Sequence, residues 1–257
     1  MTALLDPLAD FRLDGKVAVV TGASAGLGTR FAQVLHAAGA SVAVTARRAE
    51  RLATLVEEMP GTLAIPADVA VAEDRERIVA ETVAHFGTVD VLVNNAGTAA
   101  PMPIEEETLE LMHNVLEVNT VAVWHLAKLC GVHMVEQGSG SIINIASILG
   151  LVGGTPIKQA HYCASKGAVI NLTRELALQW ARRGVRVNVI CPGWFPSELT
   201  ADMVDDPASQ SFIQKNTPIA RMGELRELDG ALLLLAGRAG SFITGQAIVV
   251  DGGWTAR

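Results

Sequence analysis

Strand-length apolar runs alternate with amphipathic helical segments along the whole of this 257-residue chain. The apolar runs predict strands over 16–21, 41–45, 62–66, 89–93, 141–147, 186–190 and 246–250. Between them, apolar residues at helical spacing predict helices over 29–38, 48–59, 73–86, 106–137 (interrupted near Asn119), 161–183 and 225–236. This alternation is typical of a doubly wound α/β fold, with one parallel sheet, right-handed crossovers and helices on both faces. No repeat, low-complexity tract or linker divides the chain, so we expect a single domain over residues 1–257.

The composition agrees with a sheet that is buried on both sides and excludes several classes of protein. Hydrophobic residues make up 50% of the chain and aromatic residues only 4%, as expected for Ala-, Val-, Leu- and Ile-rich parallel strands. The net charge of −7 argues against a nucleic-acid partner, which would need clustered Lys and Arg. No apolar run approaches the roughly 18 residues of a membrane helix, and the first residues lack the pattern of a secretory signal.

Neither the cysteines nor the histidines are spaced as metal ligands. Cys130, Cys163 and Cys191 are far apart and form no Cys-x-x-Cys pair, and the six histidines show no metal-binding pattern. Small buried thiols of this kind are typical of a reducing compartment. We therefore expect a cytoplasmic protein without a metal site.

Three glycines lie where the first predicted strand turns into the first predicted helix. Gly22, Gly26 and Gly28 in this position permit a tight turn, a close approach of phosphate to the backbone, and close packing of helix on strand. A phosphate would bind at the positive N-terminus of that helix. The spacing is Gly-x-x-x-Gly-x-Gly, which differs from the general Gly-x-Gly-x-x-Gly fingerprint of dinucleotide sites, but the strand–turn–helix context predicts a dinucleotide.

The end of the second predicted strand indicates which dinucleotide. An acidic residue there binds the ribose hydroxyls of NAD, whereas an arginine accommodates the 2′-phosphate of NADP. This chain has Ala46-Arg47-Arg48 and no carboxylate, which favours NADP(H) over NAD(H). The alternative is that Arg47 and Arg48 are only the solvated start of a helix, although cations are unfavourable at that end of the helix dipole.

Tyr162, the only tyrosine in the chain, is followed by Lys166 at helical spacing. Residues four apart share one face of a helix, and a phenol beside an ammonium is expected to have a pKa below its usual value of about 10. Ser147 follows an apolar run at the carboxyl end of a strand, where open α/β sheets place their ligands. Together they predict a general acid/base site, although a lone tyrosine is more often a half-buried structural residue.

At this point the chain resembles the short-chain dehydrogenase/reductase family from end to end. The resemblance is carried by Thr21-Gly22-Ala-Ser-Ala-Gly26-Leu-Gly28, Asp68-Val69, Asn94-Asn95-Ala96-Gly97, Asn119, Ser147, Tyr162-Cys-Ala-Ser-Lys166, Pro192-Gly193 and Val250-Asp251-Gly-Gly253. It implies a Rossmann-type sheet of about seven parallel strands, and often a homotetramer or a dimer. Within the family, a 3-oxoacyl-thioester reductase is the subtype that we favour.

The resemblance also assigns roles. It implies that Tyr162 is the acid/base, that Lys166 lowers the tyrosine pKa and holds the nicotinamide ribose, that Ser147 polarises the substrate carbonyl, and that Asn119 bends its helix and anchors a proton-relay water. Asp68 and Val69 would contact adenine, Asn95-Ala96-Gly97 would line the cofactor floor, and the Phe195 backbone would meet the carboxamide. The implied cofactor-binding set is Gly22, Ser24, Gly26, Leu27, Gly28, Arg47, Arg48, Asp68, Val69, Asn95, Ala96, Gly97, Tyr162, Lys166, Pro192, Gly193, Phe195 and Ser197.

The chain departs from the family pattern at three places. Ala25 stands where many NADP-using members have a basic residue, which weakens the prediction of NADP. Ser197 replaces the usual threonine after the Pro-Gly turn and keeps a hydroxyl group. Fifteen positions separate Ser147 from Tyr162, more than in many relatives, so the loop 150–159 is expected to reshape the pocket.

These residues predict an NAD(P)(H)-dependent oxidoreductase that interconverts a ketone and a secondary alcohol, with a 3-oxoacyl thioester or a similar apolar carbonyl as substrate. The alternatives are a steroid, polyol or general secondary-alcohol dehydrogenase, or a dinucleotide sensor without activity, although a sensor would be expected to have lost part of the Ser/Tyr/Lys set.

Two further segments have a predicted place around the site. Residues 194–222, here called the lid segment, are expected to cover the substrate, and Trp194, Phe195, Leu199, Met203 and Phe212 either line an apolar pocket or pack the lid itself. The run Glu105-Glu106-Glu107 is interpreted as the solvated start of a helix, where acidic residues are favourable.

Overall fold

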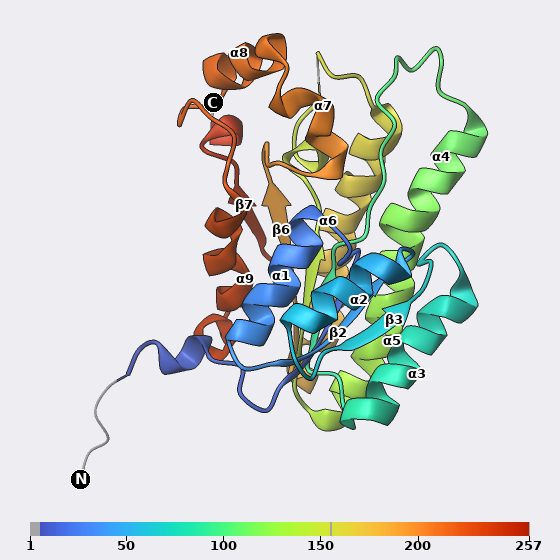
Figure 1. Ribbon diagram of the computed structural model, residues 1–257, viewed down its shortest axis with the longest axis vertical. Coiled ribbons are helices and arrows are strands. Elements are labelled where there is room, and N and C mark those ends of the chain that lie inside the picture. Colours follow the sequence, from blue (N-terminus) through green and yellow to red (C-terminus); the bar gives the residue numbers. More distant parts are fainter. Residues whose placement is uncertain (1–5, 155, 257) are drawn as a thin grey trace.

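Seven parallel strands form a single sheet in the order β3-β2-β1-β4-β5-β6-β7 (Figure 1). The computed structural model describes residues 6–154 and 156–256. The strands are β1 (Val17–Thr21), β2 (Ser41–Ala46), β3 (Leu63–Pro66), β4 (Val91–Asn94), β5 (Gly140–Ile145), β6 (Val185–Pro192) and β7 (Ala247–Val250). Every predicted strand is present, and the Rossmann-type α/β fold is confirmed. The order reverses between β1 and β4, the point at which such sheets bind their ligands.

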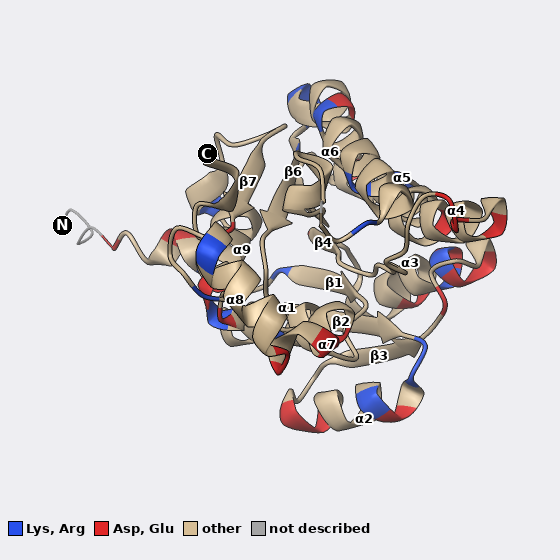
Figure 2. Cartoon of the chain, turned by 90° about the horizontal axis from the view of Figure 1, so that it is seen from above, with Lys and Arg blue, Asp and Glu red and all other residues tan. Residues whose placement is uncertain are grey.

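Helices cover both faces of the sheet, as Figure 2 shows from above. The helices are α1 (Gly26–Ala37), α2 (Ala49–Glu58), α3 (Ala72–Phe86), α4 (Leu109–Leu116), α5 (Ala122–Gln137), α6 (Ala160–Trp180), α7 (Ala201–Val204), α8 (Pro207–Asn216) and α9 (Asp229–Ala236). Apolar residues of α1, α2 and α9 share one buried cluster with one face of the sheet. Residues of α3, α5 and α6 pack on the other face. Side chains therefore alternate along each strand between two cores.

The predicted interruption near Asn119 is confirmed as a π-helical turn. Residues Glu117–Val121 form this turn between α4 and α5, and single π turns inside longer helices frequently mark functional sites. The run from Leu109 to Gln137 is long and apolar enough to cross a membrane by length and composition alone. However, Leu126, Cys130 and Met134 of α5 are buried against the sheet, so we interpret the run as a core helix pair.

Some predicted boundaries were wrong in ways that bear on the site. The helix predicted from residue 106 begins only at Leu109, with the Thr108 side chain as its N-cap, so Glu107 lies before the helix. The strand predicted to end at Ser147 ends at Ile145. Ser147 instead begins a short 3-10 turn, Ile148–Gly150, and its hydroxyl accepts a hydrogen bond from the Leu149 N–H at 3.1 Å.

Candidate active site

The glycine turn between β1 and α1 is shaped to hold a phosphate against the backbone. Gly22 has φ +67° and a Cβ there would lie 2.9 Å from the Cα of Ala96, while a Cβ on Gly28 would lie 2.2 Å from the Gly22 carbonyl oxygen. Ala25 at the N-cap of α1 gives no side-chain hydrogen bond, so the first N–H groups of the helix keep their capacity to bind an anion. These features fit the pyrophosphate of a dinucleotide. Leu27, in the same turn, packs against the core.

Asn95 fixes the turn from the neighbouring strand. Its Nδ2 donates to the Thr21 carbonyl oxygen at 2.9 Å and to the Gly22 carbonyl oxygen at 3.3 Å. The backbone N–H groups of Asn95 and Ala96 both donate to the Thr21 hydroxyl oxygen at 3.0 Å. Asn95 and Ala96, predicted to line the cofactor floor, therefore lie directly against the glycine turn.

The residues predicted for the adenosine end lie at the carboxyl ends of β2 and β3. Arg47 is exposed, whereas Arg48 donates from Nε and Nη2 to the Ser24 hydroxyl at 3.2 and 2.8 Å. Asp68 follows β3, where its carboxylate accepts from the Ala70 N–H at 2.9 Å. Val69, next in the chain, is buried.

Arg75, which the sequence analysis did not single out, connects the Asp68–Val69 loop to the π turn. Its Nη1 donates to the Val69 carbonyl oxygen at 3.0 Å and to the Glu117 carboxylate at 2.8 Å, and the residue is 4% exposed. Glu117 is the first residue of the π turn. The sequence alone does not reveal this link, because Arg75 and Glu117 are 42 positions apart.

Asn119 is fully buried at the centre of the π turn. Its Oδ1 accepts from the Thr98 N–H at 2.8 Å, and its Nδ2 donates to the Thr98 carbonyl oxygen at 2.9 Å and to the Ser165 hydroxyl at 3.0 Å. A Cβ on Gly97 would lie 3.4 Å from Asn119 Oδ1 and 3.5 Å from Lys166 Nζ. Gly97, Asn119 and Lys166, which are far apart in the sequence, thus meet at one place.

Ser147, Tyr162 and Lys166 come together where β5 and α6 face each other. Tyr162 and Lys166 lie on α6, with the lysine Nζ 5.6 Å from the centre of the tyrosine ring. Lys166 is 4% exposed, and its ammonium donates to the Ile145 carbonyl oxygen at 2.9 Å. A hydrogen bond with Ser147 acts on the Tyr162 hydroxyl.

The predicted lowering of the tyrosine pKa was wrong for this structure. Burial raises the pKa of Tyr162 to about 12, and the hydrogen bond with Ser147 offsets only part of that rise. Burial also lowers the pKa of Lys166 to about 8, because the ammonium is taken out of water. Desolvation is the largest cause of both shifts, and the phenol keeps its proton at neutral pH. A protonated phenol is the form that donates to a carbonyl oxygen.

Glu107 holds the start of α6, a function that the sequence analysis missed. Its carboxylate accepts from the Ala160 N–H at 2.8 Å and from the His161 N–H at 3.3 Å, and its Oε1 lies 2.8 Å from His161 Nδ1. The Glu107 side chain is only 6% exposed. The interpretation of Glu107 as a solvated helix start was therefore wrong: the carboxylate caps α6, which has no side-chain cap of its own.

We expect Glu107→Ala to lower the free energy of unfolding by about 1–2 kcal/mol, because two N–H groups at the helix start lose their acceptor. The turnover number should fall as well, because Tyr162 lies in the first turn of this helix. Urea unfolding and steady-state kinetics measure both effects. Glu106→Ala is the matched control: Glu106 is exposed, and its loss should change stability by no more than about 0.5 kcal/mol. Equal effects of the two substitutions would contradict the capping function.

The lid segment is anchored by aromatic packing. Trp194, Phe212 and Trp254 form a cluster of edge-on contacts with ring centres 5.5–6.5 Å apart. Phe195 is 5% exposed and packs in the core. The contacts of Phe212 favour the second alternative of the sequence analysis, that it packs the lid, whereas Trp194 and Phe195 also line a cavity.

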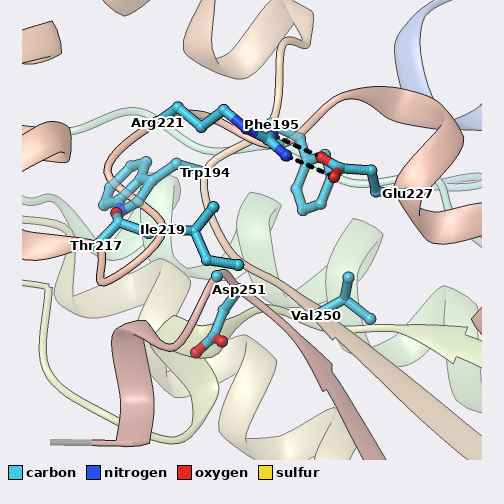
Figure 3. A pocket seen from close by; sticks show the side chains of 10 residues that line it. Trp194, Phe195, Thr217, Ile219, Arg221, Glu227, Val250 and Asp251 are labelled. Atoms are coloured by element: carbon cyan, nitrogen blue, oxygen red, sulfur yellow. Dashed lines mark hydrogen bonds and ion pairs between the residues drawn. The ribbon is translucent and has the colours of Figure 1, made fainter.

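A cavity of about 110 Å³ lies between the lid segment and β7, and Figure 3 shows Trp194, Ile219 and the Arg221–Glu227 ion pair around it. Neither Ser147 nor Tyr162 lines this cavity, so it is separate from the predicted catalytic group.

The start of the lid segment reaches the glycine turn between β1 and α1. Pro192 ends β6, and the Gly193 N–H donates to the Val250 carbonyl oxygen at 2.9 Å. A Cβ on Gly26 would lie 3.6 Å from the Cα of Ser197. Ser197 therefore borders the glycine turn, as its predicted contact with the cofactor requires. Among residues 6–154 and 156–256, no group of His, Cys, Asp and Glu side chains is arranged to hold a metal ion.

Comparison with known proteins gives a consistent result. A family model described as Enoyl-(Acyl carrier protein) reductase matches residues 22–255. The chain is 37% identical to gluconate 5-dehydrogenase of Gluconobacter oxydans (strain 621H) over 95% of its length and 96% of that protein. It is 38% identical to galactitol 2-dehydrogenase (L-tagatose-forming) of Cereibacter sphaeroides, over 95% and 97%.

Among solved structures, a gluconate 5-dehydrogenase from Burkholderia cenocepacia J2315 in complex with NADP and tartrate superposes with a TM-score of 0.93. The two sequences are 36% identical, and the superposition covers 98% of this chain and 100% of the other. Fold, motif order and full-length similarity lead to one conclusion. The chain belongs to the short-chain dehydrogenase/reductase family of oxidoreductases.

Proposed function

We propose that this protein interconverts a ketone and a secondary alcohol of a polyol or sugar acid, with NADP(H) as the preferred cofactor. The observation that carries the proposal is the assembly of Ser147, Tyr162 and Lys166 beside Asn119, at the carboxyl edge of the sheet next to the glycine turn. A dinucleotide sensor without activity would not need the first three residues together, so we rank it second.

The proposed mechanism assigns one task to each side chain. When bound, a nicotinamide would supply or accept the hydride at the carbon atom of the substrate. Ser147 and Tyr162 stabilise the negative charge that grows on the carbonyl oxygen, and Tyr162 donates the proton that forms the alcohol. Lys166, held by the Ile145 carbonyl, binds the nicotinamide ribose, while Asn119 keeps the π turn in place. In the oxidative direction Tyr162 would first have to lose its own proton, because only the phenolate accepts the proton of the alcohol.

The similar proteins support a different substrate class from the 3-oxoacyl thioester that the sequence analysis favoured. The favoured 3-oxoacyl thioester has no support among the similar proteins described above, which are named for gluconate and galactitol. The alternative of a polyol dehydrogenase fits better. The mutual packing of Trp194, Phe212 and Trp254 and the burial of Phe195 point the same way, because they leave less apolar surface free for an acyl chain.

The preference for NADP rests on the end of β2. Within the described part of the chain, Arg47 is exposed and makes no hydrogen bond or ion pair, so its guanidinium is available to a 2′-phosphate. No carboxylate follows β2 to bind the ribose hydroxyls of NAD. The gluconate 5-dehydrogenase from Burkholderia cenocepacia was solved with NADP, which supports the same preference.

We further propose a homotetramer or a dimer in the cytoplasm. Val121 at the end of the π turn, Trp124 and Val132 on α5, and Leu178 on α6 are 38–79% exposed, and an apolar surface of this kind suits a second copy of the chain. The three cysteines are free thiols, as a reducing compartment allows.

A parallel assay tests the proposal. The purified protein is offered a panel of polyols, sugar acids, steroids and 3-oxoacyl thioesters with NADPH or NADH (or the oxidised forms), and absorbance of the reduced nicotinamide is followed. We expect turnover with a polyol or a sugar acid, and a kcat/KM at least about tenfold higher with NADP(H). Turnover of the thioesters alone would instead support the 3-oxoacyl-thioester reductase that the sequence analysis favoured. Cofactor binding without turnover of any substrate would favour the sensor.

A further inference from the structure

An ion pair joins the lid segment to the adenosine end of the site. Glu198 lies in a 3-10 turn of the lid segment, directly after Ser197. Its two carboxylate oxygens accept from Arg48 Nη1 at 2.6 Å and from Nη2 at 2.8 Å. Oε1 also accepts from Arg51 Nη1 at 2.8 Å. The partners are 150 and 147 positions apart, so no local pattern places them together.

The contact uses most of the hydrogen-bonding capacity of Arg48. A guanidinium has five N–H donors, and in Arg48 the Nε and Nη2 groups already donate to Ser24. Glu198 takes one donor on each of Nη1 and Nη2, in the paired geometry by which arginine binds carboxylates and phosphates alike. A 2′-phosphate therefore cannot bind Arg48 in the same paired way while Glu198 stays in place.

The charge of Glu198 also acts on any neighbouring anion. Arg48 and Arg51 hold the pKa of the Glu198 carboxyl at about 2, so the group is a full negative charge at every physiological pH. The side chain is 55% exposed and its partner Arg48 is 36% exposed, so the pair is reached by solvent and can exchange partners. A second anion beside the carboxylate would be repelled.

We propose that Glu198 determines the balance between the two cofactors by competing with the 2′-phosphate for Arg48. This inference rests on the proposed dinucleotide function and goes beyond it. NAD(H), which has no 2′-phosphate, binds with the Glu198–Arg48 contact intact. NADP(H) gains Arg48 only when the carboxylate leaves. Binding of NADP(H) thereby releases the start of the lid segment, and the preference for NADP(H) is smaller than Arg47 and Arg48 together would allow.

Glu198→Gln tests the competition, because it keeps the size of the side chain and removes its charge. Dissociation constants for NADPH and NADH are measured by nucleotide fluorescence on the full chain without substrate. We expect the Kd for NADPH to fall roughly fivefold, as befits an exposed ion pair, and the Kd for NADH to stay within about twofold. Glu198→Asp keeps the charge and should give less than half of the fall in the Kd for NADPH. An unchanged thermal unfolding temperature shows that each variant is folded.

A second ion pair, whose glutamate lies just after the lid segment, offers the matched control. Glu227 makes an equally paired contact with Arg221, at 2.7 Å for both bonds, but that contact lies at the cavity behind the lid. Glu227→Gln should leave both dissociation constants unchanged. In the wild type, adenosine 2′,5′-bisphosphate should increase backbone hydrogen exchange at residues 198–201, whereas adenosine 5′-monophosphate should not.

The outcomes separate this inference from the proposed function. Weaker NADPH binding in Glu198→Gln, or equal changes for both cofactors, would overturn the competition and make Glu198 a support for Arg48. If the wild type prefers NADH, the proposed NADP preference fails, while the change in the ratio of the two Kd values still decides the competition. Absence of binding of either dinucleotide to the wild type would overturn both.

Discussion

Tyr162→Phe should reduce turnover by about 10³-fold or more and leave the Kd for NADPH within about threefold of the wild-type value. The substitution keeps the ring, which packs near Lys166 at 5.6 Å, and removes only the hydroxyl group that exchanges the proton. The two readouts are steady-state kinetics with a substrate from the panel and nucleotide fluorescence without substrate.

Tyrosine 162 has no substitute elsewhere in the chain, since it is the only tyrosine. Ser147 would still polarise the carbonyl group in the variant, so a small residual rate is expected from the serine and the bound nicotinamide. Substantial residual activity, within about tenfold of the wild type, would remove Tyr162 from its assigned role. Loss of NADPH binding together with activity would show that the substitution had damaged the site as a whole.

Gly28→Ala should have the second large effect. The added Cβ would lie 2.2 Å from the Gly22 carbonyl oxygen and 2.6 Å from Asn95 Nδ2, and the first of these is backbone that cannot swing away. We expect a loss of about 3 kcal/mol in the free energy of unfolding. The Kd for NADPH should rise about 30-fold, the equivalent of about 2 kcal/mol, because the displaced turn no longer aims its N–H groups at the phosphate.

Gly230→Ala is the control for this experiment. Gly230 also lies in the first turn of a helix, α9, and a Cβ there meets nothing within 4 Å. Alanine is the better helix former, so this variant should be as stable as the wild type or more stable by up to about 1 kcal/mol. Urea unfolding and NADPH titration of both variants separate a steric effect from a general intolerance of alanine. Similar behaviour of the two would contradict the packing argument.

Two features of the site were predictable because each depends on local sequence. Gly22, Gly26 and Gly28 follow a buried strand, and the break near Asn119 interrupts a helical pattern; both are present where expected.

The pKa values of the site residues were not predictable, because they depend on how far each group is removed from water. The sequence places Lys166 four residues after Tyr162, but only the packing shows that the lysine is buried and turned toward Ile145 and that the tyrosine is half-buried and desolvated. For that reason the direction of the pKa shift of Tyr162 was wrong.

The sequence by itself determined the α/β fold, the order of the motifs and the family, because strands, helices and glycine turns each follow from residues that are close together in the chain. Only the tertiary structure decided what Glu107, Arg75 and Glu198 do. Each of these charged residues contacts partners more than 40 positions away, and folding alone brings them within hydrogen-bond distance. A carboxylate in a solvated run and a carboxylate that caps α6 look the same in sequence. What distinguishes them is the set of unpaired N–H groups that the fold brings to one of them.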